Sequence, residues 1–272
     1  MFKLIVSDID GTLVGHDLQI SPRVKAAIAA AQAKGVTVTL ATGRGAEPTE
    51  RFAAEVGITA PLVCLQGGQV FDPITKRTLY EARLAPEILP WIDRVATERG
   101  WHLHFETPRM VYLPEGVPSP EVLNDLFSVT ATKRVSNFVA EVTEIPSKFL
   151  IAVHDPRERD EIMETLRELI GRAGLPVQLM VSHLQFVEGV PPGVHKASGL
   201  QWLITYLEIA PSEVLAIGDN DNDVTMLRWA QTGVAMGNAS PAALAVADWV
   251  APSVEEDGVA VAIEKFVLNG GD

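Results

Sequence analysis

Short apolar runs alternate with segments of helical pattern at both ends of this chain. In chain order they cover residues 4–9 (apolar), 21–35 (helical), 36–43 (apolar), 48–57 (helical), 61–68 (apolar), 196–209 (helical), 214–219 (apolar) and 223–230 (helical). Buried strands that alternate with helices of this length are typical of a parallel sheet covered by helices on both faces. We therefore expect an α/β core with a doubly wound, Rossmann-like parallel sheet.

The first helical pattern carries its own start and stop signals. Ser21 is suited to cap the helix, Pro22 to occupy its first position, and Gly35 to follow its last residue. Gly57 ends the second helical pattern in the same way. These signals predict a helix within 21–35.

The middle of the chain has a different sequence pattern. Long amphipathic helical patterns at 86–100 and 156–174 occur together with alternating, strand-like segments such as 101–106 and 109–114. The chain returns to the α/β pattern through the proline-containing stretch at 189–193. We therefore expect a core of residues 1–82 and 189–272, interrupted by an inserted α+β domain of residues 83–188.

The composition excludes several classes of protein. A formal net charge of -13 argues against a nucleic-acid binder that relies on a basic groove. The single cysteine, Cys64, lies in an apolar run, and it is expected to be a buried hydrophobic residue rather than part of a disulfide or zinc cluster. With no signal-peptide pattern and no membrane-spanning apolar window, we expect a soluble cytoplasmic protein with no nucleic-acid or membrane partner. The oligomeric state stays open.

Polar residues follow the apolar runs or begin a helix in four segments of the core. These segments are residues 7–13 (SDIDGTL), 41–44 (ATGR), 195–199 (HKASG) and 218–223 (GDNDND). In an open parallel sheet, ligands bind at the carboxyl ends of the strands. We therefore expect the four segments to converge on one edge of the sheet.

Four acids in these segments predict a cation site. They are Asp8, Asp10, Asp219 and Asp223. Two carboxylates about 5 Å apart repel each other by roughly 3 kcal/mol at an effective dielectric constant near 20, so several such pairs need a cation to stay ionised. Carboxylate and water oxygens suit Mg²⁺, which shares its remaining positions with phosphate.

The other polar residues in these segments suit a phosphate group. Lys196 supplies a positive charge at the start of a helix, where free backbone N–H groups also favour anions. Thr42 offers a hydroxyl, and Gly43 lets the backbone approach a ligand closely. Together with the cation, these groups predict a site for a phosphorylated small molecule.

A calcium-binding loop and a nucleotide-binding P-loop are both excluded. Asp219, Asp221 and Asp223 have the spacing of the first EF-hand ligands, but Val224 and Ala230 stand where that loop requires Gly and Glu. The sequence contains no GxxxxGK[ST] pattern.

The four segments together resemble the four motifs of the haloacid dehalogenase-like hydrolases. DIDGTL (8–13), ATGR (41–44), Lys196 and GDNDND (218–223) occur in the family's order. The insertion between the second and third motifs is similar in position and length to the C2 type of cap, as in the Cof-type phosphatases of subclass IIB. The resemblance implies a Mg²⁺-dependent phosphatase of small phosphorylated metabolites, sugar phosphates first, whose inserted domain determines substrate specificity.

The resemblance also implies roles for individual residues. Asp8 would be the nucleophile that accepts the phosphoryl group as an aspartyl-phosphate, and Asp10 would protonate the leaving oxygen and then activate water. Thr42 would bind the transferred phosphoryl group, and Lys196 would neutralise its charge and hold Asp8.

The metal would be bound by a second set of residues that overlaps the first. Asp219 would ligate Mg²⁺ together with Asp8 and the backbone carbonyl of Asp10. Asp223 would support the shell of the metal, and Asn222 would orient Asp8 or Lys196 or contact phosphate.

The chain departs from the family's pattern at two positions. Gln66 stands where the family commonly has Asn, so its expected contact with substrate or phosphate could be placed differently. His195 precedes Lys196 where Ser or Asn is common, and we expect it to start the helix and face solvent. Gly43 and Arg44 are further candidates for phosphate binding, with a salt bridge in the core as the alternative for Arg44.

Apolar and polar residues alternate along one segment of the insertion. His102, His104 and Glu106 share one face of the strand-like segment 101–106, for which we expect a solvated outer face of a sheet. A substrate-facing surface and a metal site are the alternatives. Arg109 is a candidate to bind a second anionic group of the substrate, or else to pair with a nearby acid.

Two other functions use similar residues. A phosphosugar mutase would use the same nucleophile but move the phosphoryl group within one sugar. A phospho-receiver or phosphosugar-binding regulator would combine similar Asp, Thr and Lys residues without turnover. The second acid of the DID stretch favours turnover, because it supplies the proton donor and acceptor that a regulator lacks.

Overall fold

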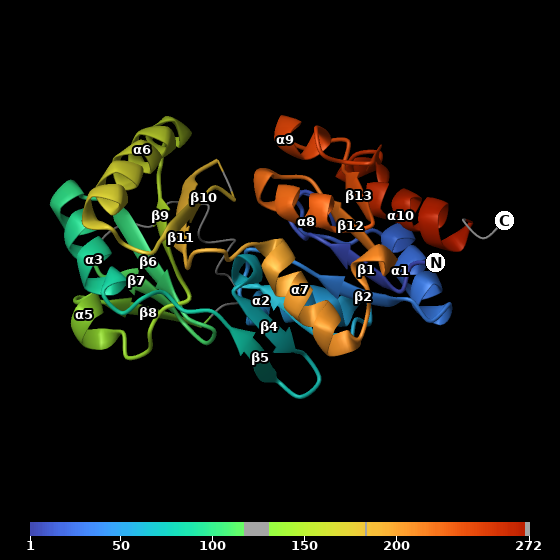
Figure 1. Ribbon diagram of the computed structural model, residues 1–272, viewed down its shortest axis with the longest axis horizontal. Helices are drawn as coiled ribbons and strands as arrows, with labels where there is room; N and C mark the ends of the chain where they lie inside the picture. Colours follow the sequence, from blue (N-terminus) through green and yellow to red (C-terminus); the bar gives the residue numbers. More distant parts are fainter. Residues whose placement is uncertain (117–130, 183, 270–272) are drawn as a thin grey trace. The chain divides into compact units, whose positions relative to one another are not determined.

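The computed structural model describes residues 1–116, 131–182 and 184–269. The chain forms two compact units (Figure 1). The first consists of Met1–Gly43, Thr49–Tyr80 and His195–Asp272, and the second of Arg44–Pro48 and Glu81–Val194. None of the described helices is long and apolar enough to cross a membrane.

A five-stranded parallel sheet forms the centre of the first unit. Its strand order is β14-β13-β12-β1-β2. The strands span Leu4–Ser7 (β1), Thr37–Leu40 (β2), Val214–Gly218 (β12), Thr232–Ala235 (β13) and Trp249–Val250 (β14). Because β1 lies between strands from the two ends of the chain, the first and last motifs are brought to the same part of the sheet.

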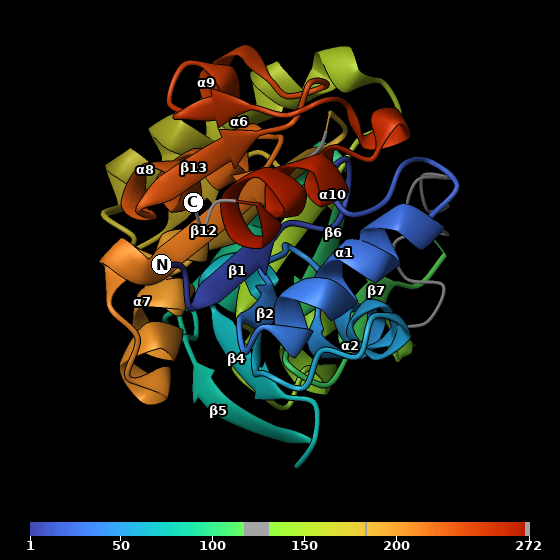
Figure 2. The same ribbon diagram turned by 90° about the vertical axis from the view of Figure 1, so that its right-hand side faces the viewer.

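Helices cover this sheet on both faces (Figure 2). They are α1 (Pro22–Ala33), α7 (Lys196–Leu207), α8 (Val224–Trp229), α9 (Pro241–Leu244) and α10 (Gly258–Ile263). The remaining helix near this unit, α2, spans Ala46–Glu55, and its residues from Thr49 onward belong to the first unit. Leu4 and Val6 of β1 pack with Leu200 of α7 and Leu227 of α8. Ile5 lies between them in the strand and points to the opposite face, where α1 packs against α10. The predicted doubly wound sheet is confirmed.

The start of α1 follows the predicted signals. The Ser21 hydroxyl accepts a hydrogen bond from the backbone N–H of Val24 at 3.1 Å, and Pro22 is the first helical residue. Gly35 follows the helix with φ at +82°, a value that Gly adopts without steric cost.

A small three-stranded sheet extends the first unit beyond β2. Its strands are β3 (Leu62–Cys64), β4 (Gln69–Asp72) and β5 (Arg77–Glu81). A parallel bridge between Ala41 and Val63 joins β3 to the end of β2. Cys64 is fully buried, as its apolar run predicts.

The second unit contains a six-stranded sheet with helices on one face. The strand order is β10-β11-β9-β6-β7-β8. The elements are α3 (Ile88–Arg99), β6 (His102–Glu106), β7 (Val111–Pro114), β8 (Thr132–Val135), α5 (Phe138–Glu141), β9 (Lys148–Ala152), α6 (Pro156–Ala173), β10 (Gln178–Met180) and β11 (Phe186–Val190). Phe105 and Phe149 of the sheet form a core with Ile92 of α3 and Leu166 of α6.

The other face of β6 corrects one prediction. His102, His104 and Glu106 do share a face, but they are only 5%, 0% and 3% exposed, so the expected solvated face is wrong. Lys148 lies opposite Glu106 in the neighbouring strand β9, and its ammonium group pairs with Glu106 at 3.1 Å and with Glu188 at 2.7 Å. Strand alternation determines which residues share a face, but not whether that face is covered.

Candidate active site

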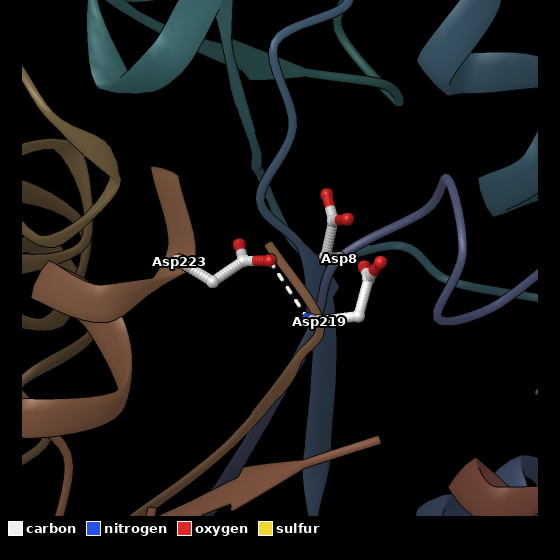
Figure 3. Close-up of side chains that lie close together, drawn as sticks. All are labelled: Asp8, Asp219 and Asp223. Carbon is white, nitrogen blue, oxygen red and sulfur yellow. Dashed lines mark hydrogen bonds between the residues drawn. The ribbon is translucent and has the colours of Figure 1, made fainter. Parts of the chain in front are cut away.

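The end of β1 places Asp8 beside the end of β12. Strand β1 ends at Ser7, which pairs with Ile217, and the backbone N–H of Asp8 donates to the Ile217 carbonyl at 3.0 Å. Asp219 directly follows β12, so the two acids are brought to the same edge of the sheet. Figure 3 shows their carboxyl groups close together, with that of Asp223 beside them.

Asp223 organises the loop that carries Asp219. Its Oδ2 atom accepts hydrogen bonds from the backbone N–H groups of Asp219 and Asn220, both at 2.9 Å. The first of these bonds is drawn in Figure 3. Because a Cβ atom on Gly218 would lie 2.6 Å from the Asp223 carboxyl carbon, only glycine lets the side chain pack against this backbone.

Lys196 joins Asp8 to Asp223. It is the first residue of α7, and its Nζ atom lies 2.6 Å from Oδ1 of Asp8 and 2.6 Å from Oδ1 of Asp223. Its side chain is fully buried. Burial alone would lower the pKa of Lys196, but the ion pairs with Asp223 and Asp8 outweigh burial and raise it, so the lysine stays charged.

The acids at this edge favour a bound cation. Burial raises the pKa of Asp8 well above its usual value; Lys196 offsets part of this shift, and the charges of Asp223, Asp219 and Asp10 add to it. Burial, followed by the charge of Asp223, raises the pKa of Asp219 to about 7. One lysine therefore does not balance these carboxylates, and a divalent cation would stabilise their ionised forms.

The arrangement of donor atoms fits Mg²⁺. Oxygen atoms of Asp8, Asp219 and Asp223 all lie within 4.8 Å of one another. Among the described residues, side chains and backbone donate hydrogen bonds to both carboxylate oxygens of Asp223, but only to Oδ1 of Asp8 and Oδ1 of Asp219. Asp8 and Asp219 are thus the side chains best placed to ligate the metal, with Asp223 holding the loop. The Asp10 side chain is exposed and does not belong to this acidic group.

Three further residues stabilise the loops that carry the acidic group. The Thr12 hydroxyl donates to Oδ1 of Asp219 at 2.8 Å, and the backbone N–H of Ser240 donates to the Asp219 carbonyl at 2.7 Å. The Asn238 amide donates to the Gly11 carbonyl at 2.8 Å. Thr12 lies in the first motif and could have been proposed from it, but nothing in the local sequence distinguishes Asn238 or Ser240.

The second motif is linked to the fourth through Gln66. The backbone N–H of Gln66 donates to the Thr42 carbonyl at 3.0 Å, and the Asn222 amide donates to the Gln66 side-chain oxygen at 3.0 Å. A Cβ atom on Gly43 would lie 2.5 Å from the Gln66 amide nitrogen. Gln66 is fully buried with φ at +60°, an uncommon conformation for a residue other than glycine. Thr42, Gly43, Gln66 and Asn222 therefore form one connected group.

His195 and Arg44 lie outside the groups described above. His195 starts α7 as expected, but it does not simply face solvent: it is half-buried, and its ring accepts a hydrogen bond from the backbone N–H of Ser198. Arg44 is buried and belongs to the second compact unit rather than the first.

Comparisons with known proteins agree with these features. The family model for haloacid dehalogenase-like hydrolases matches residues 5–263. The 5-amino-6-(5-phospho-D-ribitylamino)uracil phosphatase YcsE of Bacillus subtilis is 29% identical, over 98% of this chain and 96% of its own.

Two solved structures show the same fold. A haloacid dehalogenase-like hydrolase from Bacteroides thetaiotaomicron is 28% identical with a TM-score of 0.86, covering 98% of this chain and 100% of its own. A HAD subclass IIB sugar phosphatase, at 24% identity, has a TM-score of 0.82 over 97% of this chain and 98% of its own. The family suggested by the motifs is confirmed: the chain belongs to the haloacid dehalogenase-like hydrolases and is a phosphatase.

Proposed function

We propose that this phosphatase hydrolyses phosphate monoesters of small metabolites, sugar phosphates first, with Mg²⁺ and through an aspartyl-phosphate on Asp8. The observation that carries the proposal is the buried contact of Lys196 with Asp8, next to Asp219. A carboxylate held by a charged lysine in an acidic, buried group is positioned for attack on an anionic phosphoryl group. Bound Mg²⁺ would offset the negative charge of Asp8 and of the phosphoryl oxygens.

The first half-reaction transfers the phosphoryl group to the protein. An oxygen of Asp8 forms a bond to phosphorus as the bond to the leaving oxygen breaks. Asp10 donates a proton to that leaving oxygen, which departs as an alcohol. Lys196 stays protonated and stabilises charge on the transferred group, as phosphoryl transfer requires.

The second half-reaction restores Asp8. Asp10, now a carboxylate, takes a proton from a water molecule as the water oxygen attacks phosphorus. The bond between phosphorus and Asp8 breaks, and phosphate is released. The exposed position of Asp10 supports this role, because a group that exchanges protons in both halves must reach substrate and water.

The connected group around Gln66 would position the phosphoryl group. We assign Thr42 and Gly43 to phosphate binding through the hydroxyl and the backbone, and Asn222 and Gln66 to holding that loop or contacting the substrate. Arg44 remains a candidate for phosphate binding. These assignments are supported by the hydrogen bonds that connect the second and fourth motifs.

The substrate class is supported by what similar proteins are named for. One relative is a phosphatase of a phosphoribityl compound, and a structure of the same fold is a sugar phosphatase. We propose that residues 83–188 act as the specificity domain, with Arg109 as a candidate contact to a second anionic group. A cytoplasmic location and the absence of a nucleic-acid partner stay predictions from the sequence.

Phosphate release from a panel of phosphate esters tests this function. We expect release by the wild type with Mg²⁺, none with EDTA, and a loss of at least about a thousandfold in Asp8→Asn, because the nucleophile is removed. Asp160→Asn is the matched control, since that acid lies on α6 with a side chain that is 79% exposed; it should keep full activity.

Other outcomes would replace the proposal. Transfer between positions of one sugar without net phosphate release would establish the mutase. A stable phospho-Asp8 without turnover would establish the regulator.

A further inference from the structure

The helix that presents Lys196 begins with an unusual cap. Ser, Thr, Asp and Asn are the side chains preferred at this position, because a short side-chain oxygen accepts a hydrogen bond from the first turn. In α7 the N-cap is His195, and its Nδ1 atom takes that role, accepting from the backbone N–H of Ser198 at 3.1 Å.

Ser198 completes the cap from the other side. The backbone N–H of His195 donates to the Ser198 hydroxyl oxygen at 3.0 Å, and that hydroxyl donates to the His195 carbonyl at 2.7 Å. Nδ1 accepts only in the neutral ring with its proton on Nε2. Burial lowers the pKa of His195, which favours this neutral form.

The first turn of α7 is also packed tightly against the loop after β3. A Cβ atom on Gly67 would lie 2.1 Å from the His195 carbonyl oxygen, and one on Gly199 would lie 2.8 Å from the Gly67 Cα. The backbone at the start of α7 therefore has no room to shift towards this loop. The cap fixes the internal geometry of the turn through its bonds between His195 and Ser198.

We infer that His195 is a positioning residue for Lys196. Its imidazole ring affects the rate of catalysis by capping the helix that carries Lys196, not by contact with substrate. The inference rests on the proposed function. Lys196 directly follows His195, and its Nζ atom reaches two buried carboxylates at 2.6 Å. A small displacement of the first turn lengthens both ion pairs, which weakens the hold on Asp8. Misplacement of a catalytic group by about 1 Å lowers rates by up to about a hundredfold.

Three variants test the inference by steady-state kinetics on the best ester of the panel. His195→Ala removes the acceptor and should lower kcat by about tenfold to a hundredfold. His195→Asn supplies a side-chain oxygen that caps helices well, and should stay within about threefold of the wild type. Ser21→Ala is the matched control, because it removes the equivalent cap of α1 (Ser21 to Val24) away from the site.

Thermal unfolding separates positioning from general destabilisation. Both His195→Ala and Ser21→Ala should lower Tm by about 2–4 °C, since a lost cap has a similar effect on each helix. Only His195→Ala should lose turnover. If His195→Ala does not fold, Ser198→Ala removes the other half of the cap and should lower kcat in the same direction.

Three outcomes overturn the inference. They are full kcat in His195→Ala (or in Ser198→Ala, if that variant is needed), an equal loss of kcat in Ser21→Ala, and failure of His195→Asn to restore turnover. A wild type that releases no phosphate would instead refute the proposed function, so the two failures are distinguishable.

Discussion

At the scale of single residues, the site depends on buried charged groups that stay ionised only because they pair with one another. Lys196 stays charged although it is buried, because Asp8 and Asp223 lie on either side of it. Removing Lys196 would leave the buried carboxylates of Asp8 and Asp223 without a compensating charge, which costs several kcal/mol. The glycines around the site let the backbones that carry these charges approach one another.

Gly67→Ala should destabilise the protein by more than Gly35→Ala. Both glycines have positive φ, at +95° and +82°, so each substitution carries a conformational cost of about 1–2 kcal/mol. At Gly35 a Cβ atom meets nothing within 4 Å, whereas at Gly67 it meets the His195 carbonyl oxygen. We expect an additional loss of roughly 2 kcal/mol for Gly67→Ala and a fall in kcat, since α7 must shift. Urea denaturation and phosphate release measure both, and equal stabilities of the two variants would contradict the close approach.

At the scale of elements, the sheet of the second unit carries charge on a buried face. Glu106, Lys148 and Glu188 are each at most 3% exposed, and their strands are neighbours in the sheet. Beside them in β6 lie His102 and His104, whose rings meet edge to face with centroids 4.7 Å apart. Neutral rings suit this position, because a charged imidazolium would have to be buried next to Lys148.

This face makes stability depend on pH. Burial, with smaller contributions from His154 and Arg134, lowers the pKa of His102 to about 4. Between its usual value near 6.5 and 4, the unfolded chain binds a proton that the folded chain does not, so stability falls as the pH falls. From pH 7 to pH 5, His102 should account for a loss of about 2 kcal/mol in the free energy of unfolding.

Urea denaturation at pH 7 and pH 5 measures this loss. His102→Gln should show the smaller difference between the two pH values, because glutamine does not titrate. His16→Gln is the control, since His16 is exposed; it should match the wild type. The same pH difference in His102→Gln and the wild type would show that His102 is not held neutral.

At the scale of the whole molecule, metal binding should be coupled to folding. A ligand that binds only the folded chain stabilises it by about 2.7 kcal/mol at a hundred times its Kd. Because the acidic group of Asp8, Asp219 and Asp223 exists only when β1 and β12 pair, Mg²⁺ should bind the folded chain alone.

Addition of Mg²⁺ to the metal-free protein should raise Tm by about 5–10 °C in a thermal scan. Asp219→Asn should abolish this rise without lowering the Tm of the metal-free protein, since burial already disfavours the charged form of Asp219. Asp160→Asn should keep the rise. An undiminished rise in Asp219→Asn would place the metal elsewhere.

The sequence by itself determined the alternation of strands and helices in the core, the Ser21 cap of α1 with Pro22 as its first residue, and the membership of the family. These depend on residues close together in the chain, and on the rule that parallel strands bring their carboxyl ends to one edge. Asp8, Lys196 and Asp219 could be proposed as one site for that reason.

Only the tertiary structure decided the burial of the His102 face, the bond from Asn222 to Gln66, and the use of His195 as a cap. Burial, pKa and the partners of a side chain depend on groups that pack against it from distant parts of the chain. For His102, alternation predicted the face correctly but not its cover, because a strand's own pattern carries no information about what lies over it.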